Sequence, residues 1–394
     1  MWSRVLASWQ KLTRSKHLLV TNVKMDERIR HMKSYKHLME KCVSAQNIKL
    51  AIRKAAKGKR DRKRVQMILA DMDSYVPHFQ EMAIGYKHRN KPPKVIYDGI
   101  SRKKREIIVP SFDEQVLHHM IVNVLEPIIK KGMYEHVHGS IPKRGPYAGK
   151  KVIQKWLAHD RKNCRYVLKM DIRQFFGSIP HYTLMEYMGR YIHDEIFLKL
   201  IGEVLDTTKI GLPLGFHTSH WLANWYLQGL DHYIKEDLKA VHYMRYMDDM
   251  VIFGPNKRKL HKMRISIGEY LKNNLGLELK GNYQVFNMEY RDKHGKVRGR
   301  DLDFMGFRFR HNRITIRKAI MLRMCRKAKK LSRKEKITVH DCKQMMSALS
   351  WLKNTDTYNM YLKYIKPYVN FQYMKRRISR YDKRQNRRLN YAVV

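Results

Sequence analysis

Two adjacent aspartates, Asp248 and Asp249, lie between two short apolar segments in a chain with a formal net charge of +47. Adjacent carboxylates repel each other, and the repulsion costs free energy unless a dication or strong hydrogen-bond donors lie between them. Mg²⁺ takes few carboxylate ligands and fills its shell with phosphate oxygens. The pair therefore predicts a phosphoryl-transfer site, provided that a third carboxylate arrives from elsewhere.

The segments on either side of this pair predict how it is presented. Val241 to Arg245 and Met250 to Phe253 are short and apolar enough to be strands, and Met247-Asp248 is typical of a tight turn. We expect a β-hairpin that carries both carboxylates at its tip.

A third carboxylate, Asp171, follows the short apolar run from Tyr166 to Met170, which predicts a buried strand. At the end of that strand, Asp171 can converge with Asp248 and Asp249. Two metal ions about 3.5–4 Å apart can then activate an attacking hydroxyl and stabilise the leaving oxygen. A lone aspartate at a strand end is more commonly a helix cap or a solvated charge. The aspartate pair, Asp248 and Asp249, which follows a second predicted strand, favours the metal site instead.

Six motifs in order resemble those of the prokaryotic reverse transcriptases, closely from Gly99 to Lys280 and loosely to Phe309. They are Arg105 to Pro110 with Asp113 and Gln115, Asp171 to Phe176, Gly211 to Ser219, Tyr246 to Asp249, Leu275 to Lys280, and Phe304 to Phe307. The order and spacing are far more specific than any one motif. The resemblance is to enzymes of group II introns, diversity-generating retroelements and bacterial defence systems.

The resemblance implies a catalytic set and a cofactor. Asp171, Asp248 and Asp249, with the backbone carbonyl of Ile172, hold two Mg²⁺ ions, for which Mn²⁺ can substitute. Lys280 corresponds to a lysine that protonates the leaving pyrophosphate, a general-acid role. An exposed lysine after a strand is common, so the alternative for Lys280 is a solvated charge.

The resemblance also implies how a nucleotide is bound. Arg105 clamps the triphosphate, with its neighbours Arg102, Lys103 and Lys104 as alternative ligands. Phe176 packs under the deoxyribose and excludes a 2′-OH. Tyr246, Gly215 and Ser219 complete the nucleotide site, with Gly215 allowing close backbone approach. The structural alternatives are a core aromatic for Phe176 and a helix N-cap for Ser219.

The run Phe304-Met305-Gly306 resembles the primer grip of these enzymes, in which backbone and aromatic rings contact the primer strand.

Some features depart from the family pattern. Leu214 replaces a glutamine common in retroviral and group II intron enzymes, which favours diversity-generating or defence-associated enzymes. His220, in contrast, replaces a glutamine that is typical of diversity-generating retroelements. Retron-type Asn-Ala-x-x-His and Val-Thr-Gly signatures are absent, and nothing after the thumb matches an HNH endonuclease.

The composition fits a polyanion-binding protein. Lysine and arginine number 82 against 35 acidic residues, which is the electrostatic footprint of a nucleic-acid binder. No run of 18 apolar residues occurs, so a membrane span is not predicted. The four cysteines are widely spaced and predict reduced, mostly buried thiols. Met1 to Met25 is basic, and we interpret it as a helix of a cytoplasmic protein.

These observations predict an α+β right-hand polymerase. Its parts are a basic N-terminal helical extension over residues 1–95, fingers and palm over 96–310, and a basic helical thumb over 311–394. The expected partners are an RNA template that belongs to a cognate structured RNA, a DNA product and dNTPs, with a homo-oligomer or an accessory protein as further options.

The predicted function is RNA-directed DNA synthesis, in bacterial antiphage defence, because the chain is compact and lacks endonuclease and retron features. A diversity-generating retroelement is the second biological role. The other functions kept open are template-independent DNA synthesis, RNA-templated RNA synthesis and a non-catalytic, RNA-binding maturase.

Overall fold

The computed structural model describes residues 34–88, 92–97 and 104–391, with side chains as far as residue 384. Its helices before the palm are α3 (Leu38–Val43), α4 (Ala45–Ala55), α5 (Lys63–Ala70), α6 (Val76–Ile84), α7 (Phe112–Lys131) and α8 (Pro146–His159). Those of the palm are α9 (Phe175–Ser178), α10 (His181–Gly189), α11 (Glu195–Leu205), α12 (His217–Tyr226), α13 (Gln228–His232), the π-helical turn η1 (Tyr233–Asp237) and α14 (Lys257–Leu275). The last four are α15 (Lys318–Ser332), α16 (Val339–Lys353), α17 (Tyr358–Tyr364) and α18 (Phe371–Tyr391).

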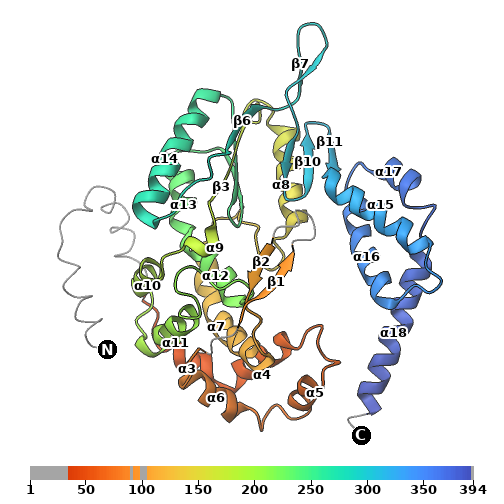
Figure 1. Ribbon diagram of the computed structural model, residues 1–394. Helices are drawn as coiled ribbons and strands as arrows, with labels where there is room; N and C mark the ends of the chain where they lie inside the picture. Colours follow the sequence, from red (N-terminus) through yellow and green to blue (C-terminus); the bar gives the residue numbers. More distant parts are fainter. Residues whose placement is uncertain (1–33, 89–91, 98–103, 392–394) are drawn as a thin grey trace, which may run out of the picture.

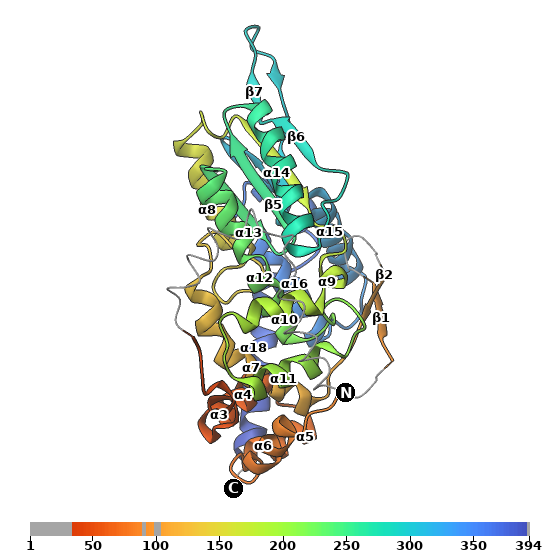
Figure 2. The ribbon, with the colours of Figure 1, turned by 90° about the vertical axis from the view of Figure 1, so that its left-hand side faces the viewer.

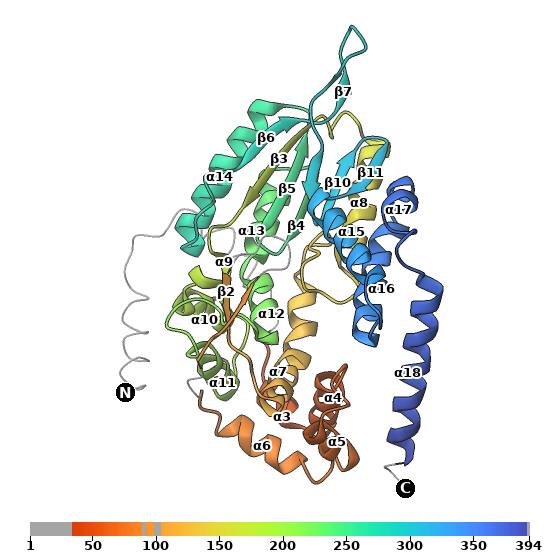
Figure 3. The same ribbon diagram turned by 45° about the vertical axis from the view of Figure 1, so that its right-hand side comes forward.

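The central sheet of the palm has the strand order β4-β5-β3-β6, and all its pairs are antiparallel. Its strands are β3 (Tyr166–Asp171), β4 (His242–Tyr246), β5 (Asp249–Gly254) and β6 (Gln284–Asn287). Side chains alternate between the two faces, as the period of a strand requires. Leu168 and Met170 join one core with α14, whereas Val167 joins another with α8. Helices α14 and α8 therefore lie on opposite faces of the sheet (Figures 1 and 3).

Helices α3, α4 and α6 pack on α7, and so does α12 of the palm. Helix α7 begins at a capping box, in which Ser111 Oγ accepts from the Glu114 N–H at 3.2 Å and Glu114 accepts from the Ser111 N–H at 2.5 Å. An antiparallel hairpin of β1 (Lys94–Tyr97) and β2 (Lys104–Ile107) projects beside these helices (Figure 2). Residues of α3 to α6 share one hydrophobic core with the palm.

A second sheet, of β9 (Leu302–Phe304), β10 (Phe307–Arg310) and β11 (Arg313–Ile316), joins the palm to the last helices. Between β6 and β9 the chain forms a separate hairpin of β7 (Tyr290–Arg291) and β8 (Val297–Arg298). Helices α15 to α18 surround a hydrophobic cluster of their own and lie beside the palm (Figures 1 and 3).

The structure confirms the predicted α+β right-hand polymerase fold. The strands expected on either side of the aspartate pair are present, and so is the strand before Asp171. All four cysteines are free thiols, and three of them are buried. The helix predicted for the basic N-terminus lies outside the described residues. Among the residues that are described, no helix is long and apolar enough to cross a membrane.

Candidate active site

The two paired strands β3 and β5 bring the three aspartates together. In the register of the sheet, Asp171 is the direct partner of Asp249, and Asp249 is also paired with Tyr246 on β4. Directly opposite residues on one face have Cβ atoms about 4.5–5.5 Å apart. Asp248 lies in the turn that joins β4 to β5, next to Met247, whose φ of 56° is left-handed. The hairpin predicted from the sequence therefore presents its carboxylates beside Asp171.

Burial and mutual repulsion control the protonation of this cluster. Burial raises the pKa of Asp248 to about 7, and the charges of Asp171 and Asp249 add to that rise. Burial also raises the pKa of Asp249, as does the charge of Asp171, while the positive charges of Lys169, Lys280 and Arg317 oppose it. The ionised cluster is therefore unfavourable in the protein alone, and a cation would stabilise it.

Lys280 supplies one positive charge. Its ammonium group contacts Asp171 Oδ2, and its backbone N–H donates to the Asp171 carbonyl at 2.8 Å. Two backbone hydrogen bonds pair Ile172 with Leu279. One is this bond from Lys280, and in the other the Arg173 N–H donates to the Glu278 carbonyl at 2.8 Å. Neither bond uses the Ile172 carbonyl. The structure thus places Lys280 and Ile172 next to the aspartates.

The residues present fit a divalent cation. Asp171 Oδ1 is buried and has no hydrogen-bond partner, and the three carboxylates share one end of two paired strands. Oxygen ligands of this kind suit Mg²⁺. Within the described part of the chain, no three His, Cys, Asp or Glu side chains already enclose an ion site, and Lys280 lies at Asp171 instead.

An ion pair beneath the turn fixes the position of the aspartate pair. Arg245 Nε and Nη2 donate to the two carboxylate oxygens of Asp231 on α13, at 2.7 and 2.6 Å, and both side chains are fully buried. Tyr243 donates its hydroxyl to the same carboxylate at 2.7 Å. Arg245 Nη1 donates to the Met247 carbonyl at 3.1 Å. The turn is therefore tied through Arg245 to a helix of the palm.

A second contact holds the other side of the same turn. A Cβ on Gly139 would lie 2.5 Å from the Met247 backbone nitrogen, so only glycine fits there. Asn224 on α12 donates to the Gly139 carbonyl at 2.9 Å and accepts from Arg245 Nη1 at 3.1 Å. The loop at Gly139 thus closes over the turn with its glycine.

Phe176 lies in a short helix. Gln174 has a left-handed φ of 44°, and α9 begins at Phe175. Phe175 is 2% exposed, whereas Phe176 is half-buried, with its ring 5.4 Å from the His220 ring. The two rings therefore face different environments, and the role of Phe176 as a sugar-selecting residue stays a prediction.

The glycine of the Gly211 to Ser219 motif contacts protein backbone. Gly215 has a φ of +108°, and a Cβ there would lie 2.3 Å from the Ile108 carbonyl oxygen. The Ile108 N–H donates to the Leu214 carbonyl at 2.8 Å, which fixes the chain after β2 to this loop. Ile108 thus approaches the Gly215 backbone closely, and the contact of Gly215 with a nucleotide stays a prediction. Lys104 and Arg105 are exposed on β2, and Lys104 pairs with Glu106 at 3.3 Å.

Two further expectations need correction. Ser219 is not an N-cap, because α12 begins at His217; its buried hydroxyl donates to the Pro213 carbonyl at 2.7 Å and closes the loop. Stacking of Phe304 on a primer is also wrong, because its side chain is fully buried in the core on the α8 face. Met305 is buried as well, and Gly306, at φ +85°, packs against Trp351. A primer grip here would act through the backbone of this turn.

The sequence reasoning missed the network of Arg245, Asp231 and Asn224. One signal was available: Arg245 ends an apolar strand directly before the motif, and a buried arginine needs a carboxylate partner. Nothing in the sequence identified Asp231 as that partner.

Tyr246 was named as a nucleotide contact. It is half-buried, and burial and the charge of Asp249 raise the pKa of its hydroxyl.

Residues 89–309 match the family of reverse transcriptases (RNA-dependent DNA polymerases), which is more than half of the chain. The protein therefore belongs to the reverse transcriptase family. Members of this family generally use divalent metal ions.

The chain is similar to the retron Ec73 reverse transcriptase of Escherichia coli, with 25% identity over 214 residues, which cover 50% of this chain and 64% of that protein. It is 27% identical to the group II intron-encoded protein LtrA of Lactococcus lactis subsp. cremoris over 50% of this chain and 33% of that protein. Apo telomerase from Candida tropicalis aligns with a TM-score of 0.46 and 11% identity, over 68% of this chain and 57% of that one. The chain spans less than two thirds of each of these relatives, so the activity of the whole protein is a matter for inference.

We expect the double variant Asp248→Ala/Asp249→Ala to lose nucleotide incorporation while keeping its fold. Without metal, its melting temperature should be no lower than that of the unaltered protein, because burial and repulsion no longer penalise two carboxylates. Asp237→Ala, which removes an exposed carboxylate of the same palm, is the control and should change neither property. Primer extension and thermal melting are the measurements, and extension by the double variant would contradict the assignment.

Asp231→Ala should destabilise the protein by about 3–5 kcal/mol, because it leaves the Arg245 charge buried without a partner. Removal of Asp382 from its exposed pair with Lys343 is the control and should cost no more than about 1 kcal/mol. In Asp231→Leu/Arg245→Met, apolar side chains replace the pair, which should restore most of the stability. Incorporation should stay low in this double variant, because the Met247 carbonyl has lost its donor. Urea unfolding and primer extension separate the two effects; full activity in the double variant would exclude a positioning role.

Proposed function

We propose that this protein is an RNA-directed DNA polymerase that uses two-metal phosphoryl transfer. The observation that carries the proposal is the pairing of Asp171 with Asp249 across β3 and β5, with Asp248 beside them at a fixed turn and Asp171 Oδ1 buried without a partner. Three carboxylates that end paired strands, in a chain of net charge +47, suit chemistry on phosphates of a nucleic acid.

Asp171, Asp248, Asp249 and the Ile172 carbonyl are the proposed ligands of two Mg²⁺ ions, for which Mn²⁺ could substitute. When bound, the ions lower the pKa of the primer 3′-hydroxyl and neutralise charge on the triphosphate and the leaving pyrophosphate. Lys280 would move from Asp171 to the leaving phosphates as Asp171 takes up metal. From there its ammonium group can donate a proton to the leaving oxygen.

Basic side chains around the aspartates support binding of template, primer and nucleotide. Lys169 and Arg317 are close enough to influence Asp249 electrostatically. A cavity of about 640 Å³ is lined by both, together with Arg300 and Arg308. Two aspartates also line it, Asp301 paired with Arg308 and Asp303 paired with Arg317. Arg105 on the exposed β1-β2 hairpin remains the proposed triphosphate clamp, because a guanidinium can bind phosphate oxygens in pairs.

The proposed biological role is antiphage defence with a cognate structured RNA, in the bacterial cytoplasm. Similarity to a retron reverse transcriptase is consistent with this role. The apolar Leu214 in place of glutamine fits a defence-associated enzyme and also keeps a diversity-generating retroelement as the second candidate role. Its backbone carbonyl receives the Ile108 N–H, a bond that any side chain at this position permits.

Extension of a DNA primer on an RNA template of mixed sequence tests the proposed activity. We expect dNTP- and Mg²⁺-dependent products whose sequence is complementary to the template, and none from Asp171→Asn. Products that form without template would indicate template-independent synthesis, and incorporation of rNTPs alone would indicate an RNA polymerase. RNA binding without any incorporation would leave the maturase as the function.

Phe176→Val should raise the use of rNTPs relative to dNTPs, because a rigid ring under the sugar excludes a 2′-OH, and misplacement of a substrate can cost about 10²-fold in rate. Phe175→Val is the matched control: its ring is buried in the core, so this change should lower the melting temperature and leave sugar preference alone. The measurements are the rNTP/dNTP incorporation ratio and the melting temperature. An unaltered ratio in Phe176→Val, with a lower melting temperature, would show that Phe176 only packs.

A further inference from the structure

A cavity of about 810 Å³ lies at the end of the palm sheet opposite to the aspartates. Tyr166 begins β3 at this cavity, and Asp171 ends β3 at the active site, so the two are about 17 Å apart along the strand. Pro255, just after β5, and Asn287, the last residue of β6, line the cavity too. Its volume is in the range of about 300–1,000 Å³ that ligand sites occupy. It is distinct from the site that the proposed polymerase reaction uses.

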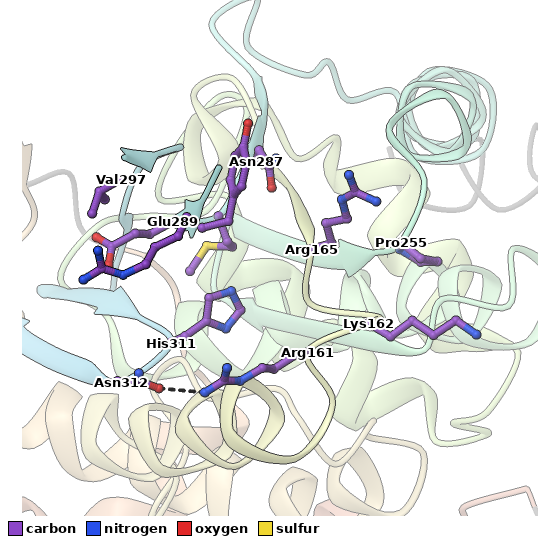
Figure 4. Close-up of a pocket in the computed structure, with 12 residues that line it drawn as sticks. Arg161, Lys162, Arg165, Pro255, Asn287, Glu289, Val297, His311 and Asn312 are labelled. Carbon is purple, nitrogen blue, oxygen red and sulfur yellow. Dashed lines mark hydrogen bonds between the residues drawn. The ribbon is translucent and has the colours of Figure 1, made fainter. Parts of the chain in front are cut away.

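The walls of the cavity come from three loops held against one another. Arg161, Lys162 and Arg165 precede β3, Tyr290 and Arg291 belong to the β7-β8 hairpin, and His311 and Asn312 form the turn between β10 and β11. The Met288 N–H donates to the Arg165 carbonyl at 2.9 Å, and Arg161 Nη2 donates to Asn312 Oδ1 at 2.9 Å (Figure 4). The cavity is therefore a built feature of the fold.

The lining is strongly positive. Arg161, Lys162 and Arg165 are exposed, and in the described part of the chain none of them has a carboxylate within ion-pair distance. The acidic residue of the lining, Glu289, already pairs with Arg310 at 3.2 Å. Cations that the protein leaves without carboxylate partners suit an anionic ligand, and guanidinium groups suit phosphate in particular.

Two further features indicate a nucleotide chain rather than a free anion. Tyr290 is 46% exposed at the rim, and an exposed aromatic ring beside fixed cations is the usual platform for unpaired bases. His311 lies within the cavity, between Arg161 and Glu289 in Figure 4. An imidazole in the wall of a cavity can bond a ribose hydroxyl or a phosphate oxygen.

We infer that this cavity binds an unpaired RNA segment outside the template–primer duplex, with its phosphates on Arg161 and Arg165 and a base stacked on Tyr290. The inference rests on the proposed function in one respect, that the polyanion is RNA. It assigns RNA anchoring to the end of the palm sheet at Tyr166 and synthesis to the end at Asp171. An acidic protein segment would use the same charges but has no use for the stacking platform.

The test uses the full-length protein and oligouridine that carries 4-thiouridine. In Arg161→Ala/Arg165→Ala, the slope of log K against log[salt] should become shallower by about 1.4, because each phosphate contact on a single strand contributes about 0.7. Lys262→Ala/Lys272→Ala removes two exposed charges from α14 and is the matched control, with no change expected. All four positions are exposed, so melting temperatures should change little, apart from the loss of the exposed Arg161–Asn312 hydrogen bond in the arginine variant.

Photocrosslinking locates the bound segment. A crosslink to the peptide that contains Tyr290 is expected in the unaltered protein and in Tyr290→Phe, which keeps the ring. Tyr290→Ala should weaken binding of the oligomer by about 5-fold or more, because stacking contributes about 1–3 kcal/mol per base. Primer extension on a short annealed primer–template should not change in any of these variants.

The outcomes separate this inference from the proposed function. An unchanged salt slope in the arginine variant, or crosslinks that avoid the Tyr290 peptide, would overturn it and favour a free-phosphate or acidic-protein site. Crosslinks at Tyr290 in a protein that fails to extend any primer would keep the RNA site and remove the polymerase. Loss of extension on the short primer–template in the arginine variant would also overturn it, since the cavity would then serve synthesis itself.

Discussion

Arg245 and Asp231 form an ion pair in which neither side chain has exposed surface, and the geometry of the aspartate turn depends on it. A buried pair of this kind is not by itself evidence of stability, since taking two charges out of water costs about as much as their attraction returns. Its effect here is on position. Arg245 joins α13, through Asp231, to the Met247 carbonyl, and so holds a turn with a left-handed residue between two strands.

The fixed turn matters because the carboxylates that it presents oppose their own assembly. Burial and proximity raise the pKa values of Asp248 and Asp249, so the apo protein bears a cost that scales with how closely they approach. A flexible hairpin would relax by moving them apart. The pairing of Asp171 with Asp249 and the Arg245 bond to the turn prevent that relaxation, while Lys280 offsets part of the charge. Preorganisation of this kind is what electrostatic catalysis requires.

The strands and the carboxylates were predictable because they depend on local pattern. An apolar run that ends at Asp171, and two that flank Asp248, are read directly from residue order. The contacts that position these strands and carboxylates could not be predicted, because each contact joins segments far apart in the sequence. They are Gly139 to Met247, Asn224 to Arg245, and Ile108 to the loop at Gly215. For the same reason the N-cap alternative for Ser219 and the stacking of Phe304 on a primer were wrong. Burial, which depends on long-range packing, determines what their side chains can touch.

The palm sheet gives the molecule two ends with opposite chemistry. At one end three acidic residues meet, and at the other end arginines line a cavity with no carboxylate paired to them among the described residues. Both ends are joined by the same rigid strands, so a polyanion held at the basic end would have a defined distance to the carboxylates. Net charge alone would attract RNA to many parts of a +47 protein without orienting it. A built cavity with a stacking ring adds the orientation, and that is the physical reason to separate anchoring of the RNA from its use as a template.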